Sequence, residues 1–297
     1  MIGKQRMLGT LSLYPSRIPA EHRRTLGIPM TIHNRAKQKL LAGQLSLGIG
    51  LRQARTVDIA RIARSCDYDW LFIDMEHNSM DQDTAAQICV AALDVGITPL
   101  VRVPGHEHFH ASRLLDTGAL GIVAPHVNNR AEAERLVSNC LFPPAGKRSI
   151  PGGMPQVQFQ PVPITELVTL INTGTLIVAM IETPEGLENV DAIAALEGID
   201  VLLMGGNDMA AELGIHGQFT HPRMRQAFAT IATACHRHGK FPGVGGIYDH
   251  DIMAEYIAAG ARFILSGSDL SFMMTGAKAR SSYLRSLQHA GGEEVLP

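Results

Sequence analysis

Eight short apolar runs, each followed by a segment with helical periodicity or by the chain's C-terminal part, constrain the fold of this 297-residue chain most strongly. Gly, Pro or Asn residues separate the runs from the segments that follow. The runs are nearly continuous in apolar residues, as is typical of strands buried on both faces of a parallel sheet. We predict strands at residues 44–50, 69–74, 98–103, 120–126, 175–182, 199–205, 241–246 and 261–267.

Helices are predicted between these strands, and several end on Gly, the residue that favours left-handed helix ends. They span residues 56–65, 83–96, 110–118, 130–140, 185–198, 221–239 and 250–260. Alternating strands and helices indicate parallel strands joined by crossover helices. We therefore predict a closed (β/α)8 TIM barrel, with an open doubly wound sheet as the alternative.

The barrel is expected to form one domain over residues 35–297 with a C-terminal helix, because single barrels of ~250 residues are common. Residues 1–34 are expected to be an N-terminal extension. Eight of the first 40 residues are Lys or Arg and one is acidic, so a transit peptide or a basic arm is an alternative for this segment.

Composition excludes several classes of protein. A formal net charge of -2 and 5% aromatic residues give no basis for nucleic-acid binding. No window approaches the ~20 apolar residues that a membrane span needs. The four cysteines are far apart and form no CxxC pair, which favours reduced thiols and a cytoplasmic protein.

Acidic and basic residues gather where the predicted strands end. Asp74, Glu76 and His77 follow the second strand, and the others are Arg102, His126, Glu182 and Asp208, at or just past the ends of the third to sixth strands. In a (β/α)8 barrel, catalytic residues lie at the mouth, the end where the C-termini of the strands and the following loops meet. The sequence therefore predicts an active site there.

Glu182 and Asp208 are candidate metal ligands. A carboxylate that closes an apolar strand needs a cation or hydrogen bonds to stay ionised. Glu182 and Asp208 end neighbouring strands, so they are predicted to share one Mg2+, Mn2+ or Co2+ ion with waters and substrate oxygens. The alternative is that each carboxylate caps the helix that follows it.

His77 is a candidate general base, with Asp74 three residues earlier predicted to orient its ring. The alternative is a hydrogen-bonded structural histidine. Arg102 closes a strand of apolar residues and has no role in packing there. Its guanidinium is predicted to stabilise an oxyanion or an enolate.

Seven segments, in this order along the chain, resemble the HpcH/HpaI aldolase family. They are DYDWLFIDMEHNSMD (67–81), VRVPG (101–105), LLDTGALGIVAPHV (114–127), FPPAGKRS (142–149), IETPEGLENVDAIAALEGID (181–200), GGNDMAAELG (205–214) and GARFILSGSD (260–269). The resemblance covers residues 35–275. It implies a barrel of the phosphoenolpyruvate/pyruvate type and a metal-dependent class II aldolase that acts on 2-oxo acids such as 4-hydroxy-2-oxoheptanedioate or 2-dehydro-3-deoxyglucarate.

The resemblance also implies residue roles. Glu182 and Asp208 match the family's metal ligands, His77 its general base and Arg102 the arginine that steadies the pyruvate enolate. Asp116 matches an acid that raises the basicity of this histidine.

Backbone amides of the turn at Gly206, Asn207 and Asp208 match the segment that binds the substrate carboxylate. The family commonly has GPAD where this chain has GGND, so the turn is expected to be looser. His126 is predicted to bind substrate. A histidine at this position resembles the macrophomate synthase branch of the family, whose enzyme decarboxylates oxaloacetate and adds the resulting enolate to an acceptor.

Three functions remain open at this stage. The first is aldol cleavage or formation between pyruvate and an aldehyde, and the second is macrophomate synthase-like chemistry on oxaloacetate. The third is a non-catalytic binding barrel. The resemblance further implies a homo-oligomer, a hexamer built as a trimer of dimers, with exchanged C-terminal helices.

Overall fold

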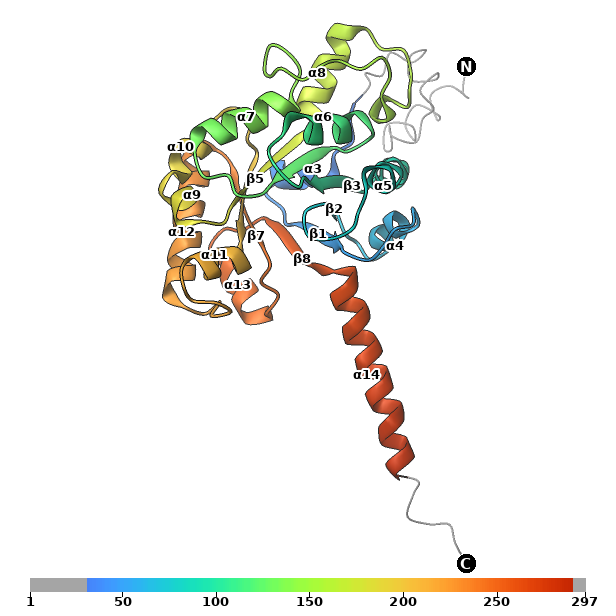
Figure 1. Cartoon of the computed structure of the whole chain (residues 1–297), viewed down its shortest axis with the longest axis vertical. Helices are drawn as coiled ribbons and strands as arrows, with labels where there is room; N and C mark the ends of the chain where they lie inside the picture. The colour runs from blue at the N-terminus through green and yellow to red at the C-terminus, as the bar shows by residue number, and fades with distance from the viewer. Residues whose placement is uncertain (1–30, 291–297) are drawn as a thin grey trace, which may run out of the picture.

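The computed structural model describes residues 31–290, and their strands close into the predicted barrel with all eight neighbouring pairs parallel. The strands are β1 (Ser46–Leu51), β2 (Trp70–Asp74), β3 (Thr98–Arg102), β4 (Gly121–Ala124), β5 (Leu176–Ile181), β6 (Val201–Gly205), β7 (Phe241–Gly245) and β8 (Phe263–Ser268). All eight predicted strands are thus confirmed. Figure 1 shows them at the centre of the molecule with helices around them.

Helices follow every strand. They are α3 (Arg35–Leu41), α4 (Ile59–Ser65), α5 (Gln82–Val95), α6 (His108–Asp116), α7 (Arg130–Cys140), α8 (Ile164–Gly174), α9 (Pro184–Glu188), α10 (Val190–Ala194), α11 (Gly206–Glu212), α12 (Pro222–His238), α13 (His250–Ala258) and α14 (Asp269–Ala290), with a 3-10 turn, η2, at Pro155–Val157. The single helix predicted over 185–198 is two helices that meet at Asn189. The predicted helices did not include α3, α8 or α11.

Two apolar layers hold the barrel together. Side chains inside the barrel include Trp70, stacked on Phe263 with ring centroids 4.1 Å apart. A larger cluster packs the outer faces of the strands against the helices. Because both faces of each strand are buried, the strand sequences are continuously apolar.

Helix α3 closes the N-terminal end of the barrel, opposite the mouth. Ala36 and Leu40 join the interior cluster. The Asn34 amide donates hydrogen bonds to the carbonyls of Leu120 and Gly174, which lie at the starts of β4 and β5. This end of the barrel is therefore sealed, and the opposite end is left for chemistry.

Helix α14 projects away from the barrel as a single long helix (Figure 1). Its exposed apolar side chains are Phe272, Met273, Met274, Tyr283, Leu284 and Leu287. Helix α14 is the last helix of the described residues. Of the predicted N-terminal extension, residues 1–34, the first 30 lie outside the described residues. The extension and its boundary therefore stay a prediction. Within residues 31–290 no helix is long and apolar enough to cross a membrane.

Candidate active site at the mouth of the barrel

Arg102 and Asp74 form the centre of the polar cluster at the mouth. Strands β2 and β3 pair in parallel with Asp74 opposite Arg102. Arg102 donates from Nε to Asp74 Oδ1 at 3.0 Å and from Nη2 to Oδ2 at 2.8 Å. Both side chains are buried, and a two-pronged pair of this kind fixes the plane of the guanidinium.

Burial acts to raise the pKa of the Asp74 carboxyl, but the hydrogen bonds and charge of Arg102 outweigh it and leave that pKa below its ordinary value. Asp74 is therefore a permanent anion at neutral pH. Its Oδ1 also accepts hydrogen bonds from the backbone N–H groups of Glu76 and His77. It thus shapes the loop that follows β2.

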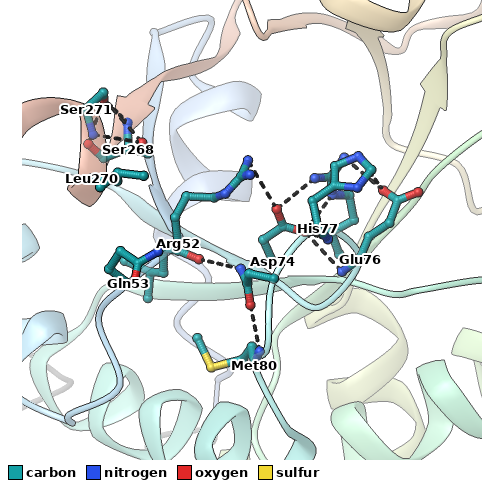
Figure 2. Close-up of polar contacts among 12 residues, drawn as sticks. Arg52, Gln53, Asp74, Glu76, His77, Met80, Ser268, Leu270 and Ser271 are labelled. Atoms are coloured by element: carbon teal, nitrogen blue, oxygen red, sulfur yellow. Dashed lines mark hydrogen bonds and ion pairs between the residues drawn. The ribbon is translucent and has the colours of Figure 1, made fainter.

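The structure corrects the predicted role of Asp74. Its carboxylate accepts hydrogen bonds from Arg102 and from the backbone N–H of His77, and among the described residues it makes no contact with the His77 ring. The acid nearest the ring is Glu76, whose Oε2 lies 3.7 Å from His77 Nε2 (Figure 2). Asp74 is therefore a residue that positions Arg102 and the loop.

Glu76 is the site residue to which the sequence analysis assigned no role. Its Oε2 lies 2.9 Å from Arg102 Nη1, and its Oε1 lies 3.9 Å from His126 Nε2. The angles of the Arg102 contact are not those of a hydrogen bond, so Oε2 is buried without a hydrogen-bond partner. Glu76 links Arg102 to both histidines at the mouth. Its place in the motif DMEH was the signal available in the sequence.

His77 lies beside this cluster with about half of its side chain exposed. Among the described residues its ring makes no hydrogen bond, only the ion-pair contact with Glu76. No hydrogen bond within the described residues supports the alternative of a structural histidine. An accessible imidazole next to a carboxylate is the arrangement that a general base needs.

Glu182 follows directly after β5 and is 1% exposed. Burial raises the pKa of its carboxyl to about 7, the backbone N–H and charge of His126 act to lower it, and the Asp208 charge acts to raise it further. Glu182 and Asp208 therefore lie close enough for one charge to act on the other. A Cβ atom on Gly205 would stand 2.2 Å from Glu182 Oε1, so only glycine leaves room for this carboxylate.

The capping alternative does not hold for these two acids. The N-cap of α9 is Thr183, whose hydroxyl accepts the hydrogen bond from the Gly186 N–H, and Glu182 precedes it. The N-cap of α11 is Gly205, and Asp208 lies in the first turn. Neither carboxylate is thus the N-cap of the helix that follows it.

The two carboxylates suit a divalent cation. A buried carboxylate with a raised pKa and a second carboxylate nearby attract a cation, and oxygen is the donor that Mg2+ and Mn2+ prefer. Within residues 31–290 no three His, Cys, Asp or Glu side chains come together as a metal-binding group. Glu182 and Asp208 would therefore need waters or substrate oxygens as further ligands.

His126 lies against Glu182, as its predicted place at the mouth requires. The strand predicted over residues 120–126 is shorter in the structure, because β4 ends at Ala124. His126 lies in the loop that follows and has a left-handed backbone with φ 49°. This bend brings its N–H to Glu182 Oε2 at 2.9 Å and its Nδ1 to 3.6 Å from the same oxygen.

Asp116 lies apart from the cluster. It is the last residue of α6 and accepts hydrogen bonds from Arg148, with Nη2 2.6 Å from Oδ1. No hydrogen bond or ion pair joins it to His77 among the described residues. Within one chain the structure does not bring together the acid and the histidine that the resemblance pairs. Gly206 and Asn207 form the first turn of α11 with Asp208, and the binding of a substrate carboxylate by this turn stays a prediction.

A closed (β/α)8 barrel with a buried carboxylate, a second carboxylate, an arginine and two histidines at its mouth defines a class of enzyme that stabilises negative charge on a small substrate. The sequence profile of the HpcH/HpaI aldolase/citrate lyase family matches residues 52–275. The chain belongs to this family.

Named relatives agree with this assignment. The 4-hydroxy-4-methyl-2-oxoglutarate aldolase of Hapsidospora irregularis is 36% identical over 254 residues, 84% of this chain and 94% of that protein. The 5-keto-4-deoxy-D-glucarate aldolase of Shigella dysenteriae is 33% identical over 237 residues, 80% of this chain and 91% of that protein. Both relatives are aldolases, which are carbon–carbon lyases.

Solved structures are similar too. The HpcH/HpaI aldolase of Desulfitobacterium hafniense superposes with a TM-score of 0.80 at 29% identity, covering 87% of this chain and 98% of that one. Macrophomate synthase superposes with a TM-score of 0.72 at 26% identity, covering 89% and 92%.

Proposed function

We propose that this protein is a divalent-metal-dependent aldolase that cleaves or forms the C3–C4 bond of 4-hydroxy-2-oxo acids through a pyruvate enolate. The observation that carries the proposal is the buried Glu182 carboxylate, which lies within range of the Asp208 charge at the same mouth as the fixed Arg102. Membership of a family whose named members include aldolases supports it.

Glu182 and Asp208 are the residues that would hold the cation. When bound, Mg2+, Mn2+ or Co2+ supplies Lewis-acid stabilisation of negative charge on the substrate oxygens. The chain's part is to present both carboxylates at one mouth, and Gly205 leaves the space for the first of them.

The remaining residues handle the proton and the enolate. In cleavage, the C4 hydroxyl proton passes to His77, the C4 oxygen becomes the aldehyde or ketone carbonyl, and the C3–C4 electron pair stays on C3 as the pyruvate enolate. Arg102, held in one orientation by Asp74, stabilises the negative oxygen of that enolate. Protonation at C3 releases pyruvate, and the reverse sequence is aldol addition.

The test is a screen of 4-hydroxy-2-oxo acids with Mg2+, Mn2+ or Co2+, following pyruvate formation. Glu182→Ala and His77→Ala should each lower kcat/KM by about 100-fold or more. The matched controls Glu188→Ala and His236→Ala change exposed residues of the same types and should stay within about 2-fold of wild type. Near wild-type rates in Glu182→Ala would overturn the assignment.

A second candidate is macrophomate synthase-like decarboxylation of oxaloacetate followed by enolate addition to an acceptor. The contact of His126 with Glu182 favours it, since an acceptor-binding side chain must lie beside the enolate. Oxaloacetate consumption without cleavage of any 4-hydroxy-2-oxo acid would select this candidate. If the chain bound no divalent ion and acted on neither substrate, a non-catalytic binding barrel would remain.

We also propose that the protein forms a homo-oligomer, a hexamer built as a trimer of dimers, through α14. The helix leaves its own barrel with six large apolar side chains exposed, and such a surface is usually covered by a partner. A role for Asp116 toward His77 would then require a neighbouring subunit. Light scattering of the full chain and of a chain truncated after Gly276 tests this, and an equal number of subunits per particle in the two would contradict it.

We propose a cytoplasmic location, because the four cysteines are free and reduced thiols are typical of the cytoplasm. Cell fractionation tests it.

A further inference from the structure

A second arginine at the mouth, Arg52, has no role in the function proposed above. It is the first residue after β1, in the loop 52–58 that leads to α4. Its Nη1 lies 3.7 Å from Asp74 Oδ2, on the same carboxylate that Arg102 binds (Figure 2). The mouth therefore carries two guanidinium groups around one buried anion.

The Arg52 guanidinium has free hydrogen-bonding capacity, unlike that of Arg102. Among the described residues it donates no hydrogen bond, and 40% of the side chain is exposed. Arg102 is 8% exposed and is engaged by both Asp74 and Glu76. An arginine fork with its donors unpaired is suited to bind a carboxylate from solution.

The backbone that carries Arg52 is nevertheless fixed. Asp269, the first residue of α14, accepts hydrogen bonds from the backbone N–H groups of Arg52, Gln53 and Ala54 at 2.8, 2.9 and 2.6 Å. These hydrogen bonds join residues that are up to 217 positions apart in the chain. They fix the backbone of the loop at Arg52, whereas the Arg52 guanidinium donates no hydrogen bond among the described residues. Such preorganisation lowers the entropy lost when a ligand binds.

Neighbouring cations do not offer the same capacity. Arg55, on the same loop, donates to the carbonyls of Ala54 and Arg52. His106 contacts the carbonyl of Pro125 at 2.6 Å. Tyr248, from the loop after β7, lies close enough for the charges of Arg52 and Arg102 to act on its phenol, so all three residues lie at the same end of the barrel.

We propose that Arg52 determines specificity by binding the remote carboxylate of a dicarboxylic 4-hydroxy-2-oxo acid. This inference rests on the proposed function. Both relatives named above are aldolases of dicarboxylic acids. Such a substrate carries a second carboxylate at the end remote from the 2-oxo group. In the proposed function Arg102 binds the enolate oxygen at the pyruvate end, so this second carboxylate needs another cation. Among the described residues, Arg52 is an arginine at the mouth whose guanidinium has unpaired donors.

The experiment compares two substrates that differ at one end. 4-Hydroxy-4-methyl-2-oxoglutarate carries the remote carboxylate, and 4-hydroxy-4-methyl-2-oxopentanoate has a methyl group in its place. Pyruvate release by the Mg2+-loaded full chain gives kcat/KM for each. In Arg52→Met, kcat/KM should fall about 30- to 100-fold for the diacid, and less than about 5-fold for the monoacid, because only the diacid loses a charge-assisted hydrogen bond.

A binding readout separates recognition from chemistry. 2-Oxoglutarate and 2-oxopentanoate lack the 4-hydroxyl and cannot be cleaved, so each serves as a competitive inhibitor. Arg52→Met should raise the inhibition constant of 2-oxoglutarate about 30-fold and leave that of 2-oxopentanoate within about 3-fold. Arg52→Lys keeps the charge but loses the fork, and its values should fall between those of wild type and Arg52→Met.

The control Arg61→Met removes the same charge from an exposed position on α4 and should not change the ratio between the substrates. Thermal unfolding checks that each variant is folded; if Arg52→Met is not, the Arg52→Lys ratio decides. Equal losses on diacid and monoacid would refute the role of Arg52 while the proposed function stands. A wild-type enzyme that cleaves no 4-hydroxy-2-oxo acid in the screen would refute the proposed function and this inference with it.

Discussion

Replacing Glu182 by Gln should stabilise the metal-free protein at alkaline pH while it abolishes activity. Burial raises the pKa of this carboxyl from 4.5 to about 7, so the folded state disfavours the ionised form. A difference of this size corresponds to about 3 kcal/mol at 1.36 kcal/mol per pKa unit.

The sign follows from where the carboxyl is ionised. Below pH 4.5 it is neutral in both the folded and the unfolded chain and contributes nothing. Between pH 4.5 and 7 the unfolded chain loses the proton first, and the free energy of unfolding falls. Above pH 7 the full loss is present, and glutamine, which carries no charge, avoids it.

The assay is thermal unfolding in EDTA at pH 5, 6, 7 and 8, at one protein concentration. The Tm of Glu182→Gln should exceed that of wild type by roughly 5–10 °C at pH 8, and the gap should nearly close at pH 5. Saturating Mn2+ should raise the Tm of wild type but not of Glu182→Gln, because a ligand that binds only the folded state stabilises it.

The exposed residue Glu188 provides the control, since Glu188→Gln should leave Tm unchanged at each pH. A Glu182→Gln variant that is no more stable than wild type at pH 8 without metal would mean that Glu182 is compensated within the chain. The argument for a cation at this position would then lose its basis.

Three further predictions follow from the structure. Gly48→Ala should lower the free energy of unfolding by about 1–3 kcal/mol in urea titrations, because the new Cβ would stand 2.3 Å from the buried Trp70 ring; unchanged stability would mean that the ring moves freely. Arg102→Lys keeps the charge but loses the two-pronged bond to Asp74, so kcat/KM for retro-aldol cleavage should fall about 100-fold or more, and a smaller loss than in Arg52→Lys would contradict this. Calorimetric Mn2+ affinity should increase as pH rises toward and through about 7, where Glu182 gives up its proton, and a flat profile would exclude Glu182 as a ligand.

The amino-acid sequence by itself determined the barrel and the place of its active site. Strands buried on both faces must be continuously apolar, so all eight were visible as runs, and a charged residue at the end of such a run stands out. Because parallel strands that close into a barrel end at one mouth, Arg102, Glu182 and Asp208 were expected to meet there.

Tertiary structure alone decided which of these side chains become partners. Asp74 is three residues from His77 but pairs with Arg102, which β3 places directly opposite it. Asp269 clamps the backbone of Arg52 although 217 positions separate them, because β1 and β8 are neighbours in the closed sheet. Local patterns record which residues are buried, whereas the choice of partner depends on distances between strands, and those exist only once the barrel has closed.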